Sequence, residues 1–529
     1  MNIEFPERFN MADYFLYHNL EEGRANKTCL YFEDETYTYA QVAQAANRAG
    51  NLLRELDVRV EERVLIVLPD CPEFVATWFG TSRIGAVITM VNPLLPVEDY
   101  RYYLEYTRAR VAIISESLVD IFTQAAKDAR YLKHVLVVGR DGNKGNRDSS
   151  NLPDRFLSFA QSTAAMSDEL VPADTTRDDL AIWLFTSGST GHPKAAVHLH
   201  HDLPFNTEVY AKRTLGINEQ DLTVAVPKLF FGYATGTNLL FPFAVGGATA
   251  LFSERSTPQK LFEMIERFRP TILTNVPTMI NAMLNMEEAR DRDLSSLRFL
   301  LSAGEALPSE LYERWMRAFN VEILDGIGSA EMFHIYITNR LGDVKPGSLG
   351  RAVEGYEARI VDGAGREVQT GEMGTIQVRG DSAALCYWNA HEKSKEVFAG
   401  DWCTTGDQFH ADADGYYFYH GRADDMLKVS GVYVAPVEIE NCLLQHDAVR
   451  ECACIGHAEA DGLIKPKAFI VLGDDFAPSE ELAQGIKDFV KSRLALYKYP
   501  RWIEFVPSLP KNDRGKIDRK QLKSVRSDR

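Results

Sequence analysis

A loop rich in glycine and hydroxyl side chains separates an apolar, strand-like segment, Leu180–Phe185, from a second apolar stretch, Ala195–Leu199. The loop reads TSGSTGHPK and combines unhindered backbone N–H groups at its glycines, four hydroxyls and the Lys194 ammonium. A polyphosphate needs such donors. The loop differs from the common nucleotide loop G-x-x-x-x-G-K-[ST], because Pro193 precedes the lysine and an alanine follows it. A flexible linker has a similar composition, but a linker has little reason to lie between two apolar segments.

The elements that must position this loop alternate along the chain. Short apolar runs such as Val64–Leu68 and Thr271–Asn275 alternate with segments in which apolar residues recur three and four positions apart, such as Glu73–Arg83 and Pro258–Phe268. Strand–helix–strand repetition predicts α/β layers with a mostly parallel sheet. After about Gly347 the segments become shorter and are separated by glycine-bearing turns, which predicts a small β-barrel or antiparallel sheet.

The composition indicates a soluble globular protein of at least two domains. Hydrophobic residues make up 45% of the 529 residues and charged residues 25%, and a single core rarely grows beyond about 250–300 residues. The formal net charge of -17 argues against a nucleic-acid-binding protein and against docking on an anionic membrane.

The seven cysteines are scattered and odd in number, which favours free thiols in a reducing cytoplasm over a disulfide framework. The polar N-terminus, Met1–Asn10, does not read as a signal peptide. The longest apolar stretch, Asn238–Phe252, is interrupted by proline and glycine and is too short to span a bilayer. Cys452 and Cys454 form a C-x-C without a partner pair, so we expect buried strand cysteines rather than a metal site.

The phosphate-type loop resembles the TSGSTG-x-PK motif of the adenylate-forming superfamily, which includes acyl-CoA ligases, luciferases and peptide-synthetase adenylation domains. Further segments resemble that family in the same order: LSAGEALP (Leu301–Pro308), DGIGSAE (Asp325–Glu331), DWCTTGD (Asp401–Asp407), GRADDMLK (Gly421–Lys428) and PKNDRGK (Pro510–Lys516). The resemblance covers nearly the whole chain. It implies a fold with a large N-terminal domain, residues 1–423, of layered α/β subdomains plus a small β-barrel. A small mobile α+β domain, residues 424–529, would follow.

The resemblance also implies an ATP site. Its phosphate-binding residues would be Thr186, Ser187, Gly188, Ser189, Thr190, Gly191 and Lys194. The adenine would lie between two backbone segments, Gly304, Glu305 and Ala306 on one side and Asp325, Gly326 and Ile327 on the other. Asp407 would accept hydrogen bonds from the ribose hydroxyls, and Arg422 would contact the ribose or phosphate.

Catalytic roles follow from the same resemblance. Glu331 would help to hold Mg²⁺, a hard cation that prefers oxygen ligands. Lys516 would bridge the attacking carboxylate and the α-phosphate, neutralising charge that develops in the transition state. The C-terminal domain would then rotate about Asp424 and present Ser430 and Gly431 for thioester formation with coenzyme A.

One motif departs from the family pattern. The family often has Tyr-Gly-x-Thr-Glu where this chain has IGSAE, so Ala330 lacks the threonine hydroxyl that can reach the α-phosphate. One hydrogen bond to a charged group is worth about 1.5–3 kcal/mol. We therefore expect slower adenylation unless Ser329 or a water molecule replaces the missing hydroxyl.

The acyl substrate is expected to contact PKLFFGYATGT, which aligns with the family segment that lines the acyl pocket. The candidate pocket residues are Phe230, Phe231, Gly232, Tyr233, Ala303, Gly328 and His334. Aromatic rings pack well against one another, although core packing would need the same residue types. The local pattern resembles the benzoate-CoA ligase branch. Gly232 leaves space where a side chain would protrude, which suggests room for a ring substituent such as the ortho-amino group of 2-aminobenzoate.

Several alternatives stay open at this point. In one alternative the acyl adenylate is passed to a separate carrier-protein thiol. In either case the enzyme would be a monomer or a homodimer. A P-loop ATPase or kinase would release ADP, and a nucleotide sensor would not need the retained lysines and carboxylates. The histidines at 198, 200 and 201 favour a structural role near a helix start over a metal site.

Overall fold

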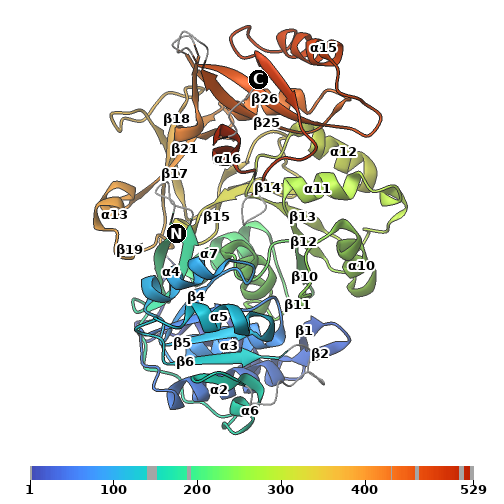
Figure 1. Ribbon diagram of the computed structural model, residues 1–529. Helices are drawn as coiled ribbons and strands as arrows, with labels where there is room; N and C mark the ends of the chain where they lie inside the picture. The colour runs from blue at the N-terminus through green and yellow to red at the C-terminus, as the bar shows by residue number, and fades with distance from the viewer. Residues whose placement is uncertain are drawn as a thin grey trace.

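The computed structural model describes residues 3–139, 152–186, 192–429, 432–458, 464–511 and 517–524. Two large sheets form most of the molecule, and a small three-stranded sheet lies beyond them, at the top of Figure 1.

The first large sheet carries the start and end of the glycine-rich loop. In sheet order its strands are β19 (Cys386–Tyr387), β9 (Lys194–Leu199), β8 (Leu180–Thr186), β4 (Val87–Met90), β3 (Arg63–Val67), β5 (Val111–Ser115), β6 (His134–Val138) and β7 (Phe156–Ser158). The strands from β8 to β7 pair in parallel, whereas β9 is antiparallel to both of its neighbours. The mostly parallel sheet predicted from the sequence is confirmed.

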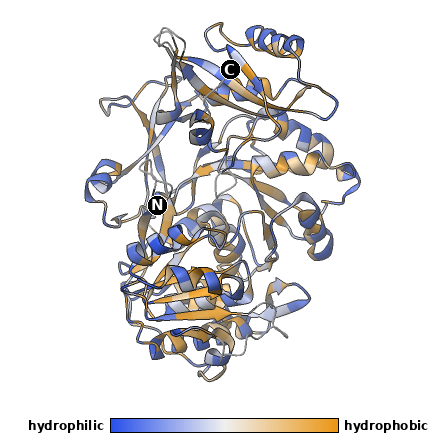
Figure 2. Ribbon diagram, in the orientation of Figure 1, coloured by the Kyte–Doolittle hydropathy of each residue, from blue (hydrophilic) through white to orange (hydrophobic). Residues whose placement is uncertain are grey.

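The second large sheet carries two of the motif segments. In sheet order its strands are β16 (Arg351–Ala352), β15 (Ile335–Thr338), β14 (Ile323–Gly328), β13 (Phe299–Ser302), β12 (Ile272–Asn275), β10 (Leu222–Ala225), β11 (Ala248–Leu251), β1 (Thr28–Phe32) and β2 (Glu35–Thr38). Pairing is parallel from β14 to β1 and antiparallel at both edges. Figure 2 shows apolar residues concentrated on the strands of the lower sheet and polar residues on the outer helices.

Helices cover these sheets and fill the space between them. They include α1 (His18–Glu21), α2 (Tyr39–Glu55), α3 (Pro72–Arg83), α4 (Val97–Thr107), α5 (Val119–Ala125), α6 (Phe159–Ala164), α7 (Asp202–Asn206), α8 (Gly232–Thr235), α9 (Phe241–Phe243), α10 (Pro258–Phe268), α11 (Pro277–Leu284), α12 (Ser309–Phe319) and α13 (His391–Val397). Helices α2 and α3 approach closely: a Cβ at Gly80 would lie 2.5 Å from the Ala46 carbonyl oxygen. Phe79 of α3 stacks on Phe243 of α9 with ring centroids 5.7 Å apart.

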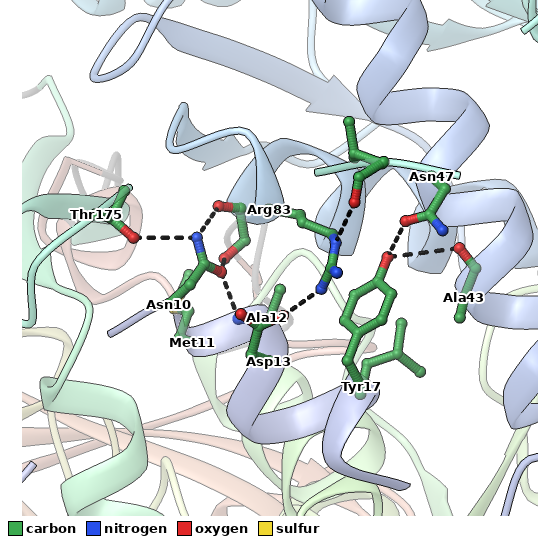
Figure 3. A network of polar contacts seen from close by, with 12 residues as sticks. Asn10, Met11, Ala12, Asp13, Tyr17, Ala43, Asn47, Arg83 and Thr175 are labelled. Atoms are coloured by element: carbon green, nitrogen blue, oxygen red, sulfur yellow. Dashed lines mark hydrogen bonds and ion pairs between the residues drawn. The ribbon is translucent and has the colours of Figure 1, made fainter. Parts of the chain in front are cut away.

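The N-terminal segment is tied to this domain by polar contacts (Figure 3). The Asn10 amide donates to the Ser82 carbonyl at 2.9 Å and to Thr175 Oγ1 at 3.2 Å. Arg83 forms an ion pair with Asp13, and its guanidinium lies 3.4 Å from the centroid of the Tyr17 ring. These contacts hold the N-terminal segment against α3.

The region after residue 350 forms an open antiparallel sheet of β17 (Glu357–Val361), β18 (Gly374–Arg379), β20 (Phe398–Ala399), β21 (Trp402–Ala411) and β22 (Tyr417–Arg422). The sequence left a barrel and a sheet open, and the described strands form the sheet: no pairing between β17 and β22 closes the described ladder.

The C-terminal part has its own hydrophobic core. Its elements are β23 (Leu427–Val429), β24 (Val432–Val434), α14 (Pro436–Leu443), β25 (Val449–Ala458), β26 (Ile464–Leu472), α15 (Glu480–Lys491), β27 (Trp502–Phe505) and α16 (Arg519–Ser524). The predicted α+β region is confirmed, and Cys452 and Cys454 are buried on β25 as expected. Among the described helices, none is long and apolar enough to cross a membrane.

Candidate active site

Three motif segments meet where parallel strands end, which is where open α/β sheets bind ligands. Strand β8 ends at Thr186, which pairs with Lys194 at the start of β9, so the glycine-rich segment closes a hairpin. Strand β13 ends at Ser302, whose register partner on β14 is Asp325. Gly304, Glu305 and Ala306 follow β13, and Asp325, Gly326 and Ile327 lie on the neighbouring β14, so the two segments predicted to enclose an adenine are adjacent.

The residues predicted to contact adenine have backbone conformations and polar contacts that suit their residue types. Gly304 has φ +89°, a conformation that suits glycine. The Glu305 carboxylate accepts hydrogen bonds from the Thr278 N–H at 3.1 Å and from its hydroxyl at 2.7 Å. Asp325 is 4% exposed, and burial raises the pKa of its carboxyl well above the usual value. Its Oδ1 has no protein hydrogen-bond partner in the described structure, so the site retains an unfilled polar group beside the predicted adenine position.

The two residues predicted to bind the ribose lie opposite one another on adjacent strands. Asp407 on β21 is the register partner of Arg422 on β22, and the guanidinium lies 3.6 Å from the Asp407 carboxylate. Arg422 also donates to the Thr405 carbonyl at 3.2 Å. The sequence predicted both residues separately, and the structure brings them together.

Glu331 lies on a short 3₁₀ turn, Ala330–Met332, between β14 and β15. Three groups from other elements hold this turn. The Tyr387 hydroxyl donates to Glu331 Oε1 at 2.6 Å, the Ala384 N–H donates to the Glu331 carbonyl at 2.7 Å, and the His198 ring contacts the Ala330 carbonyl at 2.7 Å.

Tyr387 was not among the sequence-predicted site residues. It belongs to β19, whose pairing with β9 places it beside Lys194, and the Lys194 ammonium lies 5.7 Å from the centroid of its ring. Burial, and then the Glu331 carboxylate, raise the pKa of the Tyr387 phenol, so it stays protonated and can donate. The pKa of Lys194 is lowered, mainly by burial and then by the charge of Lys393.

The missing threonine hydroxyl at position 330 has a candidate replacement. Ser329 Oγ is buried and has no hydrogen-bond partner among the described residues. A buried hydroxyl without a partner suits a ligand atom.

A strained turn joins Glu331 to the predicted acyl pocket. Phe333 has φ +66° and ψ -57°, and the His334 N–H donates to the Met332 carbonyl at 2.8 Å. These values describe a three-residue γ-turn of the rare, strained kind, and such strain clusters at functional sites. The metal-ligand candidate Glu331 and the acyl-pocket candidate His334 therefore flank this turn.

His334 is 2% exposed, and burial lowers the pKa of its imidazole to about 4. Its Nε2 lies 3.0 Å from the Tyr233 carbonyl oxygen, which can accept but not donate, so we assign the proton to Nε2. The remaining nitrogen, Nδ1, has no hydrogen-bond partner in the described structure. His334 therefore offers one buried, unfilled acceptor.

Among the aromatic pocket candidates, Tyr233 packs against this histidine, and Phe230 and Phe231 pack against each other. The Tyr233 and His334 rings lie 5.3 Å apart, and Phe230 and Phe231 lie 4.5 Å apart. Ala303 is buried at the end of β13. The pocket glycines differ in the space around them.

A Cβ at Gly328 would lie 2.4 Å from the His334 carbonyl oxygen, so backbone fills that space. A Cβ at Gly232 would lie 3.3 Å from Leu184 Cδ1. The space beside Gly232 is therefore narrower than the sequence suggested.

The histidines near β9 differ from the expected arrangement. His198 lies on β9 rather than at a helix start, and its Nδ1 lies 2.8 Å from Asp202 Oδ2. His201 precedes α7 at the helix start. His200 Nδ1 accepts the Met11 N–H at 3.2 Å, and burial lowers its pKa to about 4. These contacts are structural, and the described residues contain no group of three or more His, Cys, Asp or Glu that could hold a metal ion.

Several predicted site residues lie outside the described residues: Ser187, Gly188, Ser189, Thr190, Gly191, Ser430, Gly431 and Lys516. The backbone of Asp424 lies on a 3₁₀ turn, Ala423–Asp425, directly after β22.

The profile of the AMP-binding enzyme family matches residues 17–388, and that of the AMP-binding enzyme C-terminal domain matches residues 438–516. A benzoate-CoA ligase from Thauera aromatica is 43% identical over 525 residues, which cover 99% of this chain and 97% of that protein.

Two solved structures are similar over almost the whole chain. An anthranilate-CoA ligase in complex with anthranoyl-AMP has a TM-score of 0.92 and 42% identity, with 98% of each chain covered. A benzoate-CoA ligase from Burkholderia xenovorans LB400 has a TM-score of 0.88 and 41% identity, with 97% of this chain and 99% of that chain covered.

Proposed function

Because this chain belongs to the AMP-binding enzyme family, we propose that it is an ATP-dependent aryl-CoA ligase. An aromatic carboxylate attacks the α-phosphorus of ATP and forms acyl-AMP, releasing pyrophosphate. The thiol of coenzyme A then attacks the acyl carbon and releases AMP. The observation that carries this proposal is the turn from Glu331 to His334, which joins the phosphate side of the site to its aromatic side within three residues.

We propose that groups from three different sheets hold the nucleotide. The two carboxylate oxygens of Asp407 suit a vicinal diol, and Arg422 beside it supplies a fork of donors. Asp325 Oδ1 is an unfilled acceptor beside the proposed adenine position. Lys194 would contact phosphate oxygens, and Ser329 would supply the hydroxyl that Ala330 lacks.

The donor set fits Mg²⁺ bound together with ATP. Mg²⁺ is usually held by one or two carboxylates together with phosphate oxygens and water, and Glu331 offers one carboxylate whose Oε1 already accepts from Tyr387. When bound, the ion would offset the negative charge of the phosphates. Glu331 would orient it, and Lys516 would neutralise charge between the attacking carboxylate and the α-phosphate.

The second step would use the other face of the C-terminal domain. We propose a division at residue 424, with residues 1–423 holding the adenylate and residues 424–529 carrying Lys516. A short turn at Asp424, directly after the ribose-side strand β22, suits a hinge. Rotation about it would bring Ser430 and Gly431 to the acyl adenylate together with coenzyme A.

The proposed acyl group is benzoate or 2-aminobenzoate, because the aromatic wall suits a flat ring. The unfilled acceptor on His334 suits a ring substituent that can donate, such as an amino group. The narrow space beside Gly232 argues against a large substituent there. A cytoplasmic location is also proposed, supported by seven free cysteines.

The test is a panel of acids with Mg·ATP and coenzyme A, read by mass spectrometry for nucleotide and thioester. Benzoate, 2-aminobenzoate, 4-hydroxybenzoate, cinnamate and hexanoate would be compared. We expect AMP and an aryl-CoA, with benzoate or 2-aminobenzoate preferred. Acyl-AMP without thioester would redirect the second step to a carrier-protein thiol, and ADP would contradict the proposal.

A further inference from the structure

Tyr387 lies between the two charged groups that the proposed function assigns to the phosphates. It is 6% exposed and occupies β19, a strand of two residues at the edge of the first large sheet. Its hydroxyl donates to Glu331 Oε1 at 2.6 Å, and its ring lies 5.7 Å from the Lys194 ammonium. One side chain therefore contacts both Glu331 and Lys194.

The position of this tyrosine is fixed from several sides. Its residue pairs with Ala196 of β9, and its N–H donates to Ser394 Oγ at 3.0 Å. Its ring packs against Phe398 with centroids 5.4 Å apart. The hydroxyl is thus presented to Glu331 by a rigid edge of the sheet, and the Glu331 backbone is held from the same segment by Ala384.

The hydroxyl restricts what the Glu331 carboxylate can do. The Glu331 carboxylate can rotate about its side-chain bonds. The Lys194 ammonium, an opposite charge, lies near the ring of the same tyrosine that holds Glu331. Because Glu331 Oε1 accepts the hydrogen bond from Tyr387, Oε2 is left for another partner. Without the hydroxyl, Glu331 would be able to turn to Lys194, and both groups would be lost to the phosphates.

We propose that Tyr387 is a positioning residue that fixes the Glu331 carboxylate for the metal–nucleotide complex and keeps it from pairing with Lys194. The proposal rests on the proposed function, because it presumes that ATP binds here with Mg²⁺. Tyr387 itself contacts neither substrate nor metal in this account. Its role is exerted through the orientation of Glu331.

The test is Tyr387→Phe in the full-length protein, because phenylalanine keeps the ring and removes the hydroxyl. ATP binding would be measured by calorimetry at stepped Mg²⁺ concentrations, with no acid present. We expect the Mg²⁺ concentration for half-maximal ATP binding to rise about tenfold or more, the loss typical of one hydrogen bond to a charged group. The KM for the aromatic acid should change much less than the KM for Mg·ATP.

The matched control is Tyr39→Phe. The Tyr39 hydroxyl is fully buried and donates to the Gly247 carbonyl at 2.7 Å, away from the site, so this variant also loses one buried phenol hydrogen bond. Thermal unfolding of both variants would separate a binding change from unfolding. Tyr39→Phe should leave the Mg²⁺ requirement unchanged.

A second comparison uses Glu331→Gln. In that background, adding Tyr387→Phe should have little further effect on the Mg²⁺ requirement, because the carboxylate to be positioned is gone. An equal shift in both backgrounds would overturn the role of Tyr387, as would an unchanged Mg²⁺ requirement in the single variant. If the unmodified protein bound ATP without any dependence on Mg²⁺, the proposed function itself would fail.

Discussion

The buried pair of His198 and Asp202 offers a sharp test of how the Glu331 turn is held. Both side chains are almost fully buried, at 0% and 1% exposure, and His198 Nδ1 lies 2.8 Å from Asp202 Oδ2. The other ring nitrogen lies 2.7 Å from the Ala330 carbonyl oxygen. Because a carbonyl cannot donate, that nitrogen must carry a proton. The pair therefore holds the backbone of Ala330, the residue that precedes Glu331, in place.

The expected loss in the free energy of opening β9 follows from the polar groups that His198→Phe would deprive of the His198 ring. Asp202 would keep the Leu199 N–H at 3.1 Å as a donor but lose its ring partner, and the Ala330 carbonyl would lose its donor. Leaving a buried polar group without its hydrogen-bond partner costs about 1–3 kcal/mol, and more where the group is charged. Because the cost arises from an unpaired group, Asp202→Asn should relieve part of it. The double variant should lose about 1–3 kcal/mol less than the sum of the single losses.

The assay must report locally, because a chain with several domains does not unfold in one step. Amide hydrogen exchange of the peptide covering residues 194–202 reports the free energy of opening β9. His201→Phe is the matched control: its ring lies 3.2 Å from Asp202 Oδ1 but is 21% exposed, so we expect a loss of about 1 kcal/mol or less. Strictly additive losses, or wild-type exchange in His198→Phe, would refute the reasoning.

Three further predictions concern selectivity, domain motion and pH. Gly232→Ala should fold, because the atoms nearest to its Cβ are movable Leu184 methyl groups at 3.3–3.6 Å and the Phe333 carbonyl oxygen at 3.6 Å. The variant should change the ranking of benzoate against 2-aminobenzoate in kcat/KM. An unchanged ranking would show that Gly232 does not line the acyl pocket. Asp424→Pro should slow thioester formation more than pyrophosphate release in single-turnover measurements, whereas equal losses would argue against the hinge. Burial lowers the pKa values of His200 and His334 to about 4, below the usual 6.5. Their contribution to stability is therefore complete above pH about 6.5 and is lost as the pH falls towards 4, because the unfolded chain binds protons first. Thermal midpoints that stay constant over this range would contradict the burial of these two histidines in their neutral form.

Much of the fold was predictable because local signals and packing agree. Pro258–Phe268 was predicted as a helix with the same bounds as α10. Helix α10 has Thr257 as its cap and a proline in its first turn, and both signals are visible in the sequence. The predicted strand Thr271–Asn275 starts one residue before β12 and ends at the same residue.

The contacts of the candidate site were less predictable. Tyr387 reaches Glu331 across 56 residues through a two-residue strand, which leaves no periodic pattern. The left-handed φ at Phe333 has no sequence signal, since most such positions are glycine. His198 was expected near a helix start, but its neighbours Ala195–Leu199 form a strand whose apolar pattern could have placed it there. Such contacts depend on how separate sheets pack, and a single sequence does not show that.

The central claim is that an aromatic carboxylate is activated as an acyl adenylate. Benzoate labelled with ¹⁸O in both carboxylate oxygens tests it directly, with Mg·ATP and coenzyme A present and the AMP analysed by mass spectrometry. One carboxylate oxygen bonds to the α-phosphorus in the first step, and the acyl C–O bond breaks in the second. The account predicts AMP that carries one ¹⁸O atom per benzoyl-CoA formed. Unlabelled AMP, or ADP with labelled phosphate, would contradict it.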